Sequence, residues 1–477
     1  MGEAIPIPIP IRKPTADEGT PEDLKDVAER LIAGIEARTA RVGIIGLGYV
    51  GLPLTLLFAE ERFRVTGFDV DAEKVLRLNA GESYIHRIEP EHVRMARKAG
   101  FEATGDFARI AELDAVLICV PTPLKEDHTP DMSFVVSTME SIAPYVRAGQ
   151  LVVLESTTYP GTTEEIVVET IDRHGAARGV RVLRAAAVDA ATERGAAAGI
   201  MVAFSPERED PGNLETPRRT IPKVIGGVEE RASRTAAALY GTIFDRTVVM
   251  SSPAAAEMTK LLENIYRCVN IALVNELKQL CERMGIDIWE VIDAAATKPF
   301  GYQAFYPGPG VGGHCSPVDP FYLSWKAKQF GFSTRFIALA GEVNESMPGY
   351  VVKTVERALE RNGIALQGAR VLVLGVAYKR DVDDLRESPA LTMIELLQRA
   401  GAQVAYNDPF FARVGHGRKY ALNMESTPLS EVSQFDCVLI ATDHSVYDYG
   451  KLVAEARLIV DSRNATRDIT STKIVRC

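Results

Sequence analysis

The sequence predicts an α/β fold with two doubly wound domains joined by a long central helix. Three observations lead to this prediction. Apolar, β-branched runs alternate with helical patterns from Arg41 onwards, which is typical of parallel strands with helices over both faces of the sheet. The same succession of runs returns near the carboxyl terminus. Between the two series lies a helical pattern of about 30 residues that contains neither glycine nor proline.

The first 40 residues are expected to form a tail and an added helix. Prolines alternate with isoleucines in residues 1–14, which prevents the apolar helix of a signal peptide. Residues 21–38 have helical periodicity, with Thr20 as N-cap and Pro21 in the first helical position. The apolar face of this helix consists of Leu24, Val27, Ala28, Leu31 and Ile35. We expect the helix to pack against the main body.

Four strand-like segments of the amino-terminal half return in the carboxyl-terminal part. RVGIIGLGY (41–49) matches RVLVLGVAY (370–378), and RVTGFD (64–69) matches QVAYND (403–408). DAVLICV (114–120) matches DCVLIAT (436–442), and LVVLES (151–156) matches RLIVDS (457–462). Four repeats in the same order predict a second doubly wound domain, with ligands bound at the carboxyl ends of the strands in both.

Two segments between these series differ from them. Residues 254–284 predict one helix of about 45 Å, which can join two domains and also supply a dimer surface. The alanine- and glycine-rich residues 185–200 are expected to form a small surface excursion that carries no chemistry.

The composition excludes several classes of protein. With 54 Lys and Arg against 64 Asp and Glu, the net charge is −10, which argues against the broad basic face of a nucleic-acid-binding protein but not against acidic ligands held by a few cations. The six scattered cysteines match neither a disulfide framework nor a metal site, so we expect reduced thiols in the cytoplasm and no metal. Residues 42–59 are uncharged, but four glycines and Pro53 favour strand, turn and helix over a membrane span.

A GxGxxG motif, Gly46-Leu47-Gly48-Tyr49-Val50-Gly51, links the first strand to a helix. Its glycines allow the backbone to approach a pyrophosphate at the helix N-terminus. Asp69 ends the next strand 18 residues after Gly51. A carboxylate there accepts hydrogen bonds from the adenosine ribose and repels a 2′-phosphate. This context predicts NAD in preference to NADP, and the alternative is a tight turn that binds no ligand.

One cysteine lies in a setting suited to a nucleophile. Gly308, Gly310, Gly312 and Gly313 predict a flexible loop that can wrap a ligand, and Cys315 ends it. The remaining cysteines are expected to be buried in strands or in the long helix, or to be terminal and mobile; they are Cys119, Cys437, Cys268, Cys281 and Cys477. The alternative for Cys315 is a structural cysteine in a loop.

Motifs along residues 41–477 resemble the UDP-glucose/GDP-mannose dehydrogenase family. The matching stretches are GLGYVGLPL (46–54), VPTP (120–123), EST (155–157), FSPEREDPGN (204–213), EMTKLLEN (257–264), GPGVGGHCSPVDPFYL (308–323), YKRDVDDLRESPA (378–390) and DSRN (461–464). The sequences of these motifs are most similar to those of the branch of UDP-N-acetylglucosamine 6-dehydrogenases. Members of the family commonly supply polysaccharide or O-antigen synthesis.

The resemblance implies a four-electron oxidation of the C6 alcohol of a nucleotide sugar to a carboxylate, with two NAD reduced. Cys315 would match the family nucleophile, which holds the C6 carbon as a thiohemiacetal and then as a thioester. Lys260 and Asn264, four residues apart on the long helix, would stabilise negative charge on the reacting oxygen. Asp319 would match the aspartate that works with Lys260 in proton transfer.

The remaining site residues are also implied by the resemblance. Glu207 would activate the water that hydrolyses the thioester, and Thr157 would position that water. Pro121 and Thr122 of the VPTP motif would contact the cofactor. UDP-glucose dehydrogenases have a second glutamate where this chain has Pro211, and we assign Glu209 no role.

The second doubly wound domain lacks GxGxxG and by resemblance binds the UDP part of the substrate. Lys379 and Arg463 would lie near the diphosphate or sugar, and Gly312 would approach the substrate closely. Arg386 is either a further ligand-binding cation or a member of a structural ion pair.

These assignments predict four regions. Residues 1–40 form the tail and added helix, 41–250 an NAD-binding Rossmann domain, 251–360 a central helical domain with the Cys315 loop, and 361–477 a UDP-sugar-binding Rossmann-like domain. The expected assembly is a homodimer or larger homo-oligomer. The rival functions are UDP-glucose or GDP-mannose 6-dehydrogenase and a catalytically silent nucleotide-sugar binding protein.

Overall fold

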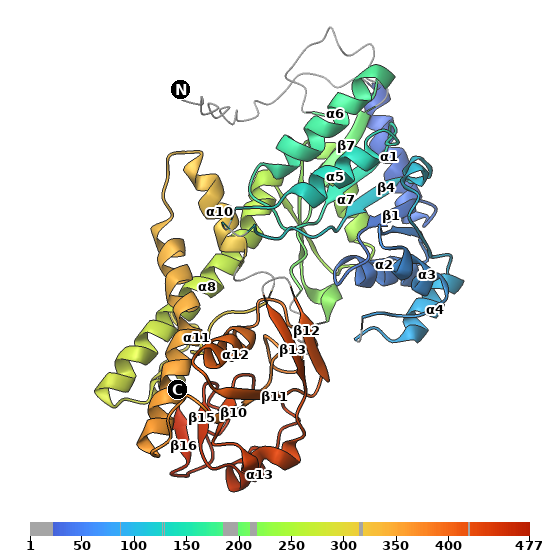
Figure 1. Ribbon diagram of the computed structural model, residues 1–477. Helices are drawn as coiled ribbons and strands as arrows, with labels where there is room; N and C mark the ends of the chain where they lie inside the picture. Colours follow the sequence, from blue (N-terminus) through green and yellow to red (C-terminus); the bar gives the residue numbers. More distant parts are fainter. Residues whose placement is uncertain are drawn as a thin grey trace, which may run out of the picture. The chain divides into compact units, whose positions relative to one another are not determined.

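The computed structural model describes residues 22–85, 87–125, 127, 129–184, 199–209, 217–313, 318–417 and 420–477. Two compact units make up the chain: residues 1–262 with 325–332, and residues 263–324 with 333–477. Each unit has its own mainly parallel sheet (Figure 1). The expected α/β fold with two doubly wound domains joined by a long helix is confirmed.

The elements up to the long helix are α1 (Glu22–Glu36), β1 (Arg41–Ile45), α2 (Gly51–Glu60), β2 (Arg64–Phe68), α3 (Ala72–Asn79), α4 (Pro90–Lys98), β3 (Glu102–Thr104), η1 (Phe107–Glu112), β4 (Ala115–Ile118), α5 (Ser133–Ile142), β5 (Leu151–Leu154), η2 (Thr163–Val168), α6 (Glu169–Gly175), η3 (Ala176–Arg178), β6 (Arg181–Val182), β7 (Gly199–Phe204), η5 (Arg218–Thr220), β8 (Lys223–Gly227), α7 (Glu230–Tyr240) and β9 (Thr247–Met250).

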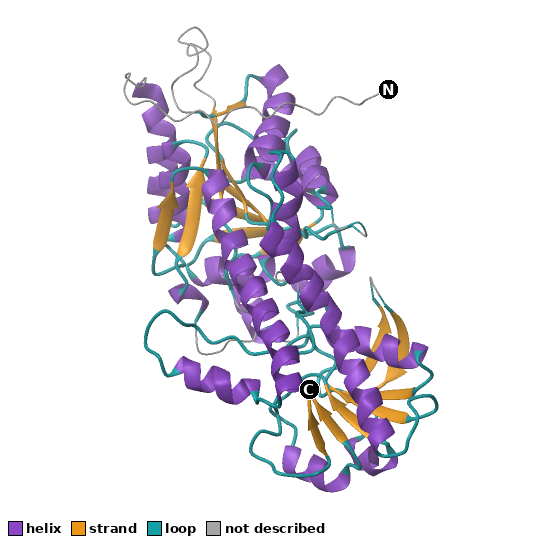
Figure 2. Cartoon of the chain, turned by 90° about the vertical axis from the view of Figure 1, so that its left-hand side faces the viewer, coloured by secondary structure: helices purple, strands orange, loops and turns teal. Residues whose placement is uncertain are grey.

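The remaining elements are α8 (Pro253–Met284), α9 (Ile288–Ala296), α10 (Asp319–Lys328), α11 (Arg335–Arg361), β10 (Arg370–Leu374), α12 (Pro389–Arg399), β11 (Gln403–Asn407), β12 (Arg413–His416), β13 (Ala421–Glu425), η6 (Leu429–Gln434), β14 (Cys437–Ile440), α13 (Tyr449–Glu455), β15 (Ile459–Asp461) and β16 (Ile474–Arg476). The long helix expected at 254–284 is confirmed as α8, and Figure 2 shows the long helices in purple. Among the described residues, no helix combines the length and apolar character that crossing a bilayer requires.

The sheet of the first unit runs in the order β3-β2-β1-β4-β5-β7-β8-β9. In addition, β6 pairs with the first two residues of β7. Neighbours from β3 to β7 are parallel, whereas β8 is antiparallel to β7. Alternate side chains of one strand enter different cores: Leu117 joins the core with α2 and α7, while Val116 and Ile118 join the core with α5 and α6. Burial of both faces explains why these strands are continuously apolar.

The added amino-terminal helix packs against the first unit, as expected. Ala28, Leu31 and Ile35 of α1 are buried in the same core as α7, and Arg234 Nη2 donates to Glu29 Oε1 at 2.7 Å. The proposed cap at residues 20–21 lies outside the described residues.

The second sheet reproduces the first at the repeated segments. Its order is β11-β10-β14-β15-β16. The pairing of Arg370 with Gln403 and of Val371 with Cys437 corresponds to that of Arg41 with Arg64 and of Val42 with Ala115 in the first sheet. The four repeated segments therefore form equivalent strands.

Two expectations about individual segments are wrong. Cys477 is not mobile: it is 2% exposed, and its amide donates to Asp461 O at 2.8 Å because β16 adds a fifth strand beside β15. Residues 199–200 do not belong to a surface excursion, because they begin the buried strand β7. Residues 185–198 lie outside the described part of the chain.

The first strand of each sheet ends in the same kind of turn. Gly46 and Gly375 have φ of +88° and +78°. A Cβ on Gly46 would lie 2.7 Å from Cys119 O, and one on Gly375 would lie 2.5 Å from Thr442 O. Each glycine is required both by its left-handed backbone and by the closeness of the neighbouring strand end.

Replacement of Gly375 by alanine should destabilise the second unit more than a matched replacement at Gly368. Both glycines have positive φ, but nothing lies within 4 Å of a Cβ at Gly368. Gly368→Ala should cost about 1–2 kcal/mol for its backbone alone, and Gly375→Ala about 1–3 kcal/mol more for the overlap with Thr442. The midpoint of thermal unfolding measures the difference. Equal midpoints would contradict this account of the turn.

Candidate functional site

The turn between β1 and α2 brings backbone atoms into a space that only glycine permits. A Cβ on Gly51 would lie 1.9 Å from Gly46 O, so α2 begins in direct contact with the end of β1. A Cβ on Gly48 would meet nothing within 4 Å, so this glycine is not required by contacts with the described residues. Tyr49 is 37% exposed, and Val50 is the N-cap residue of α2.

Asp69 follows β2 and lies against this turn. Its Oδ2 accepts the amide proton of Leu47 at 3.0 Å, and its Oδ1 accepts that of Asp71 at 3.0 Å. Lys74 Nζ lies 3.6 Å from Oδ2. The carboxylate is therefore fixed beside the glycine turn, and the arrangement fits the pyrophosphate and ribose of NAD. Thr122, which follows β4, is buried, and its neighbour Pro121 is exposed.

Lys260 and Thr157 form a buried polar pair in the first unit. Lys260, on α8, is 8% exposed, and its Nζ donates to Thr157 Oγ1 at 2.5 Å. Thr157 follows β5 and is 9% exposed. One turn before Lys260, the buried Glu257 accepts hydrogen bonds from the amides of Gly161 and Thr163. These bonds attach α8 to the segment that carries Thr157.

Asn264 and Asp319 form the corresponding pair in the second unit. Asn264 lies one helical turn after Lys260 on α8, and its Nδ2 donates to Asp319 Oδ2 at 2.5 Å. Asp319 is the first residue of α10, and the two side chains are 5% and 1% exposed. The Asp319 carboxylate fixes the orientation of the Asn264 side-chain amide. The bond uses the amide nitrogen, so the side-chain carbonyl oxygen takes no part in it.

The described part of the glycine-rich segment is packed against neighbouring chain. A Cβ on Gly312 would lie 2.7 Å from Tyr378 Cβ, and one on Gly313 would lie 2.8 Å from the Tyr378 ring. The Gly313 amide donates to Arg386 O at 3.0 Å. Gly312 and Gly313 therefore allow close packing, and a flexible loop that wraps a ligand stays a prediction. Cys315 lies outside the described residues.

Glu207 follows β7 and is held as a carboxylate. Its Oε1 accepts the amide protons of Arg208 and Glu209, each at 3.0 Å. Its Oε2 lies 3.6 Å from Lys223 Nζ. Burial by itself would raise the pKa of Glu207, but the positive charges of Lys223, Arg218 and Lys260 lower this pKa overall.

Sequence reasoning missed the charged partners behind Glu207. Lys223 Nζ donates to Glu155 Oε2 at 2.7 Å, and Tyr240 Oη donates to Glu155 Oε1 at 2.5 Å. All three residues are buried. Glu209, which was given no catalytic role, forms ion pairs with Arg218 and Arg87. The EST motif contains Glu155, but no local signal marks a lysine within an apolar strand as its partner.

The cations predicted for the second domain have different environments. Arg463 Nε donates to Ala441 O at 2.9 Å, and burial lowers the pKa of its guanidinium. Its Nη1 would lie 2.9 Å from a Cβ on Gly308. Lys379 is half-buried. Arg386 forms a bidentate ion pair with Asp384, in which Nη2 lies 2.7 Å from Oδ2. Of its two interpretations, the structure favours the ion pair.

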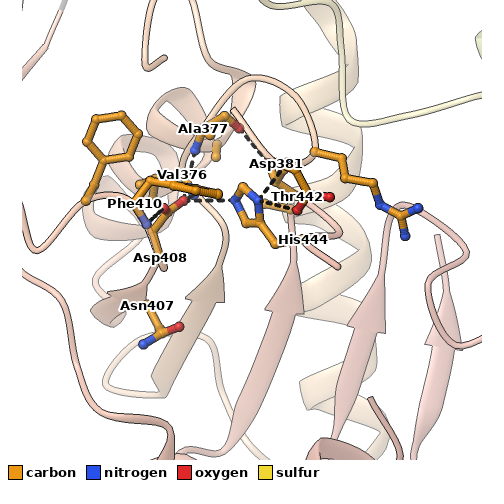
Figure 3. A network of polar contacts seen from close by, with 12 residues as sticks. Val376, Ala377, Asp381, Asn407, Asp408, Phe410, Thr442 and His444 are labelled. Carbon is orange, nitrogen blue, oxygen red and sulfur yellow. Dashed lines mark hydrogen bonds and ion pairs between the residues drawn. The ribbon is translucent and has the colours of Figure 1, made fainter. Parts of the chain in front are cut away.

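The second domain uses its equivalent of Asp69 internally. Asp408 follows β11, and its Oδ2 accepts the amide protons of Val376 at 2.7 Å and Ala377 at 3.1 Å. The same oxygen lies 3.2 Å from Nε2 of the fully buried His444 (Figure 3). The Asp381 amide donates to His444 Nδ1 at 3.0 Å, which places the ring proton on Nε2, towards Asp408. The two domains thus share a strand order but not the chemistry at the strand ends.

Comparison with protein families matches three consecutive models to the chain. They are the NAD binding domain (residues 40–244), the central domain (residues 254–346) and the UDP binding domain (residues 372–468) of the UDP-glucose/GDP-mannose dehydrogenase family.

Individual relatives agree with this match. A UDP-N-acetyl-D-mannosamine dehydrogenase of Pyrococcus horikoshii is 33% identical over 439 residues, which is 90% of this chain and 96% of the relative. One of Yersinia pestis is 38% identical over 365 residues, or 75% and 82% of the two chains. The solved structure of the UDP-D-ManNAc dehydrogenase from Pyrococcus horikoshii superimposes with a TM-score of 0.78 at 32% identity, covering 91% of this chain and 98% of that one.

Replacement of Asp69 by asparagine should raise the KM for NAD by about tenfold, because one charge-assisted hydrogen bond to the ribose is weakened. The matched control is Asp408→Asn, because Asp408 occupies the equivalent position and is bonded to His444. That variant should keep the wild-type KM for NAD. Initial rates at saturating sugar nucleotide measure both constants. An unchanged KM in Asp69→Asn would remove Asp69 from the cofactor site.

Proposed function

Because the chain belongs to the UDP-glucose/GDP-mannose dehydrogenase family and is an NAD-dependent UDP-sugar dehydrogenase, we propose that it oxidises the C6 hydroxymethyl group of a UDP-N-acetylhexosamine to a carboxylate. The observation that supports this reaction best is the paired burial of motif side chains, Lys260 with Thr157 and Asn264 with Asp319. Bound NAD supplies the acceptor for the hydride that leaves C6 at each oxidation.

The first oxidation requires transfer of the hydroxyl proton of the C6 alcohol to a base, and we assign this role to Asp319, which works with Lys260. Lys260 carries the positive charge that stabilises the resulting alkoxide, and Asn264 contributes the dipole of its amide. Asp319 orients Asn264 through the bond at 2.5 Å. Because Lys260 is already bonded to Thr157 at the same distance, its ammonium is held in place before the substrate binds, and less ordering is needed during the reaction.

The second oxidation begins when the Cys315 thiolate adds to the C6 aldehyde and forms a thiohemiacetal. Loss of a hydride from C6, with transfer of the hydroxyl proton of the adduct to Asp319 acting with Lys260, converts this adduct into a thioester. Water then adds to the thioester carbonyl while Glu207 takes one of its protons, and the C–S bond breaks to release the thiolate and the carboxylic acid, which ionises by losing its proton to solvent. Thr157 lies on the same segment of the first unit as Glu155, and we assign its hydroxyl to positioning that water.

The proposed substrate is the N-acetylmannosamine epimer of the UDP-sugar. The names of the Pyrococcus and Yersinia relatives support this epimer, whereas the motifs favour the N-acetylglucosamine epimer. Both carry the C2 acetamido group, which UDP-glucose lacks. Lys379 and Arg463 are assigned to the diphosphate or sugar, because both belong to motifs within the UDP binding domain.

NADH formation with a panel of sugar nucleotides tests this assignment. The panel consists of the UDP-linked N-acetylmannosamine, N-acetylglucosamine, N-acetylgalactosamine and glucose, with GDP-mannose. The value of kcat/KM should be highest for UDP-N-acetylmannosamine and about tenfold or more lower for UDP-glucose, since a pocket built for the acetamido group loses contacts without it. Activity confined to UDP-glucose or GDP-mannose would contradict the proposal.

The control for this panel is Cys315→Ala, which should bind NAD but form no uronic acid. A protein that binds NAD and UDP-sugars but forms no NADH with any member of the panel would instead be the catalytically silent binding protein.

We also propose that the chain forms a homodimer through α8. Its exposed apolar residues Tyr266, Leu273, Leu277, Leu280 and Met284 are spaced by seven, four, three and four positions, which aligns them along one face of the helix. An exposed apolar stripe of this kind is typical of a protein interface.

Sedimentation should therefore give about twice the mass of one 52.0 kDa chain. The double variant Leu273→Glu/Leu280→Glu should be monomeric, because it places charges within the stripe. Leu76→Glu, at a residue on α3 that is 69% exposed, is the control and should remain dimeric. A monomeric wild-type protein at micromolar concentration would refute this assembly.

A further inference from the structure

Lys223 is a fully enclosed lysine at the first position of β8. Its side chain is 3% exposed. The ammonium donates to Glu155 Oε2 at 2.7 Å and lies 3.6 Å from Glu207 Oε2. The rings of Tyr240 and Phe244 cover it, with centroids at 5.0 and 5.3 Å. Two carboxylates and two aromatic faces thus surround one positive charge.

We propose that Lys223 is a positioning residue for thioester hydrolysis, which keeps Glu207 ionised and ready to take a proton from water. This inference rests on the proposed role of Glu207 and goes beyond it, because Lys223 and Glu155 have no part in the proposed chemistry. The alternative is that Lys223 only neutralises Glu155 and that its distance to Glu207 has no consequence for the reaction.

The direction of β8 explains how Lys223 reaches Glu207. β8 is antiparallel to β7, with Phe204 paired to Gly226. Counting three residues onward from Phe204 and three back from Gly226 brings Glu207 level with Lys223. Glu155 follows β5, which is parallel to β7 with Leu154 paired to Phe204. The ends of three adjacent strands therefore bring both carboxylates to the same ammonium.

The hydrogen bonds around Lys223 are unequal, and this inequality suits a base. Glu155 accepts hydrogen bonds from both Lys223 and Tyr240. Glu207 Oε2, in contrast, is buried and accepts none from the described residues. Lys223 therefore donates a hydrogen bond to Glu155 and interacts with Glu207 only electrostatically. The Oε2 lone pairs remain available for a proton from water.

The charges also separate the two carboxylates. Burial raises the pKa of Glu155, whereas nearby cations lower that of Glu207 despite its burial. Two neighbouring carboxyl groups with pKa values moved in opposite directions are typical of an acid–base site. The titratable groups that act on Glu207 and its partners lie on η5, β8, α7 and α8 and just after β4 and β5; they are Arg218, Lys223, Tyr240, Lys260, Cys119 and Glu155.

The test follows hydrolysis directly. Enzyme in excess is mixed with NAD and UDP-N-acetylmannosamine, and acid quenching with intact-mass analysis measures the decay of the acyl-enzyme between pH 4.5 and 9. Decay should slow as the pH falls, because protonated Glu207 is no base. In Lys223→Met this acid limb should move to higher pH by about 1–3 units, which is the effect of losing an opposite charge at this distance. The burst of NADH that precedes hydrolysis should keep its amplitude.

Two further variants test the direction in which the acid limb of the pH profile shifts. Glu155→Gln keeps an oxygen for Tyr240 and Lys223 but removes a negative charge, so the acid limb should move to lower pH. The double variant Lys223→Met/Glu155→Gln removes the buried charge pair together and should give an intermediate limb. It also provides a folded test if Lys223→Met alone leaves Glu155 as an unpaired buried charge and fails to fold.

Lys326→Met is the matched control. Lys326 is a second buried lysine of the same unit, 6% exposed, which pairs with Glu165 and lies 4.7 Å from the Tyr159 ring centroid. Loss of this lysine perturbs packing to a similar degree but should leave the acid limb where it is in the wild type.

The outcomes separate this inference from the proposed function. A limb that stays in place in Lys223→Met and in Glu155→Gln, with decay slowed equally at every pH, would show that Lys223 is only structural. Wild-type decay in Glu207→Gln would overturn the role of Glu207 and this inference with it. No NADH burst in the wild type with any UDP-N-acetylhexosamine would overturn the proposed substrate; the same pH series with whichever sugar nucleotide gives a burst would then decide the role of Lys223.

Discussion

The parallel arrangement of β1, β2, β4, β5 and β7 is the constraint on which the rest of the first unit depends. Parallel strands end at the same edge, so the residues that follow them converge without being neighbours in sequence. Asp69 follows β2, Thr157 follows β5 and Glu207 follows β7. Burial of both faces by helices makes this edge the place where the strands expose backbone and polar side chains. The strand β8, running the other way, brings Lys223 to the edge from outside the parallel set.

The second unit shows that this constraint positions residues but does not determine their chemistry. Gly375 repeats the left-handed turn of Gly46, and Asp408 repeats the position of Asp69. In the first unit the aspartate is bonded to backbone amides and faces a lysine at 3.6 Å. In the second it is bonded to a fully buried imidazole that also receives the Asp381 amide. One turn geometry can therefore hold a carboxylate bonded to backbone amides beside a lysine in one domain and a carboxylate bonded to a buried histidine in the other.

Much of the fold could be predicted from the sequence because the repeated segments carry the same hydrophobic pattern and glycine turn. Positions that depend on distant partners could not. Lys223 lies in an apolar strand, and its partner Glu155 is 68 residues earlier, so no periodicity reveals the pair. The burial of Cys477 cannot be read from the sequence, because the three-residue strand before it gives too short a pattern to recognise. The glycines of residues 308–313 likewise give no local signal that Tyr378 and Pro389 pack against this segment.

The same reasoning explains how an acidic protein can bind acidic ligands. The net charge of −10 is spread over a solvated surface, where salt screens each charge within about 10 Å. Buried charges act at shorter range and are screened less. Around Glu207, the cations Lys223, Arg218 and Lys260 outweigh both burial and the neighbouring Glu155. At this carboxyl group the local electrostatic balance therefore favours the ionised form, although the whole chain carries a net negative charge. The net charge of the chain therefore does not decide whether an acidic ligand can bind, because charges within a short distance of the ligand act on it more strongly than screened surface charges.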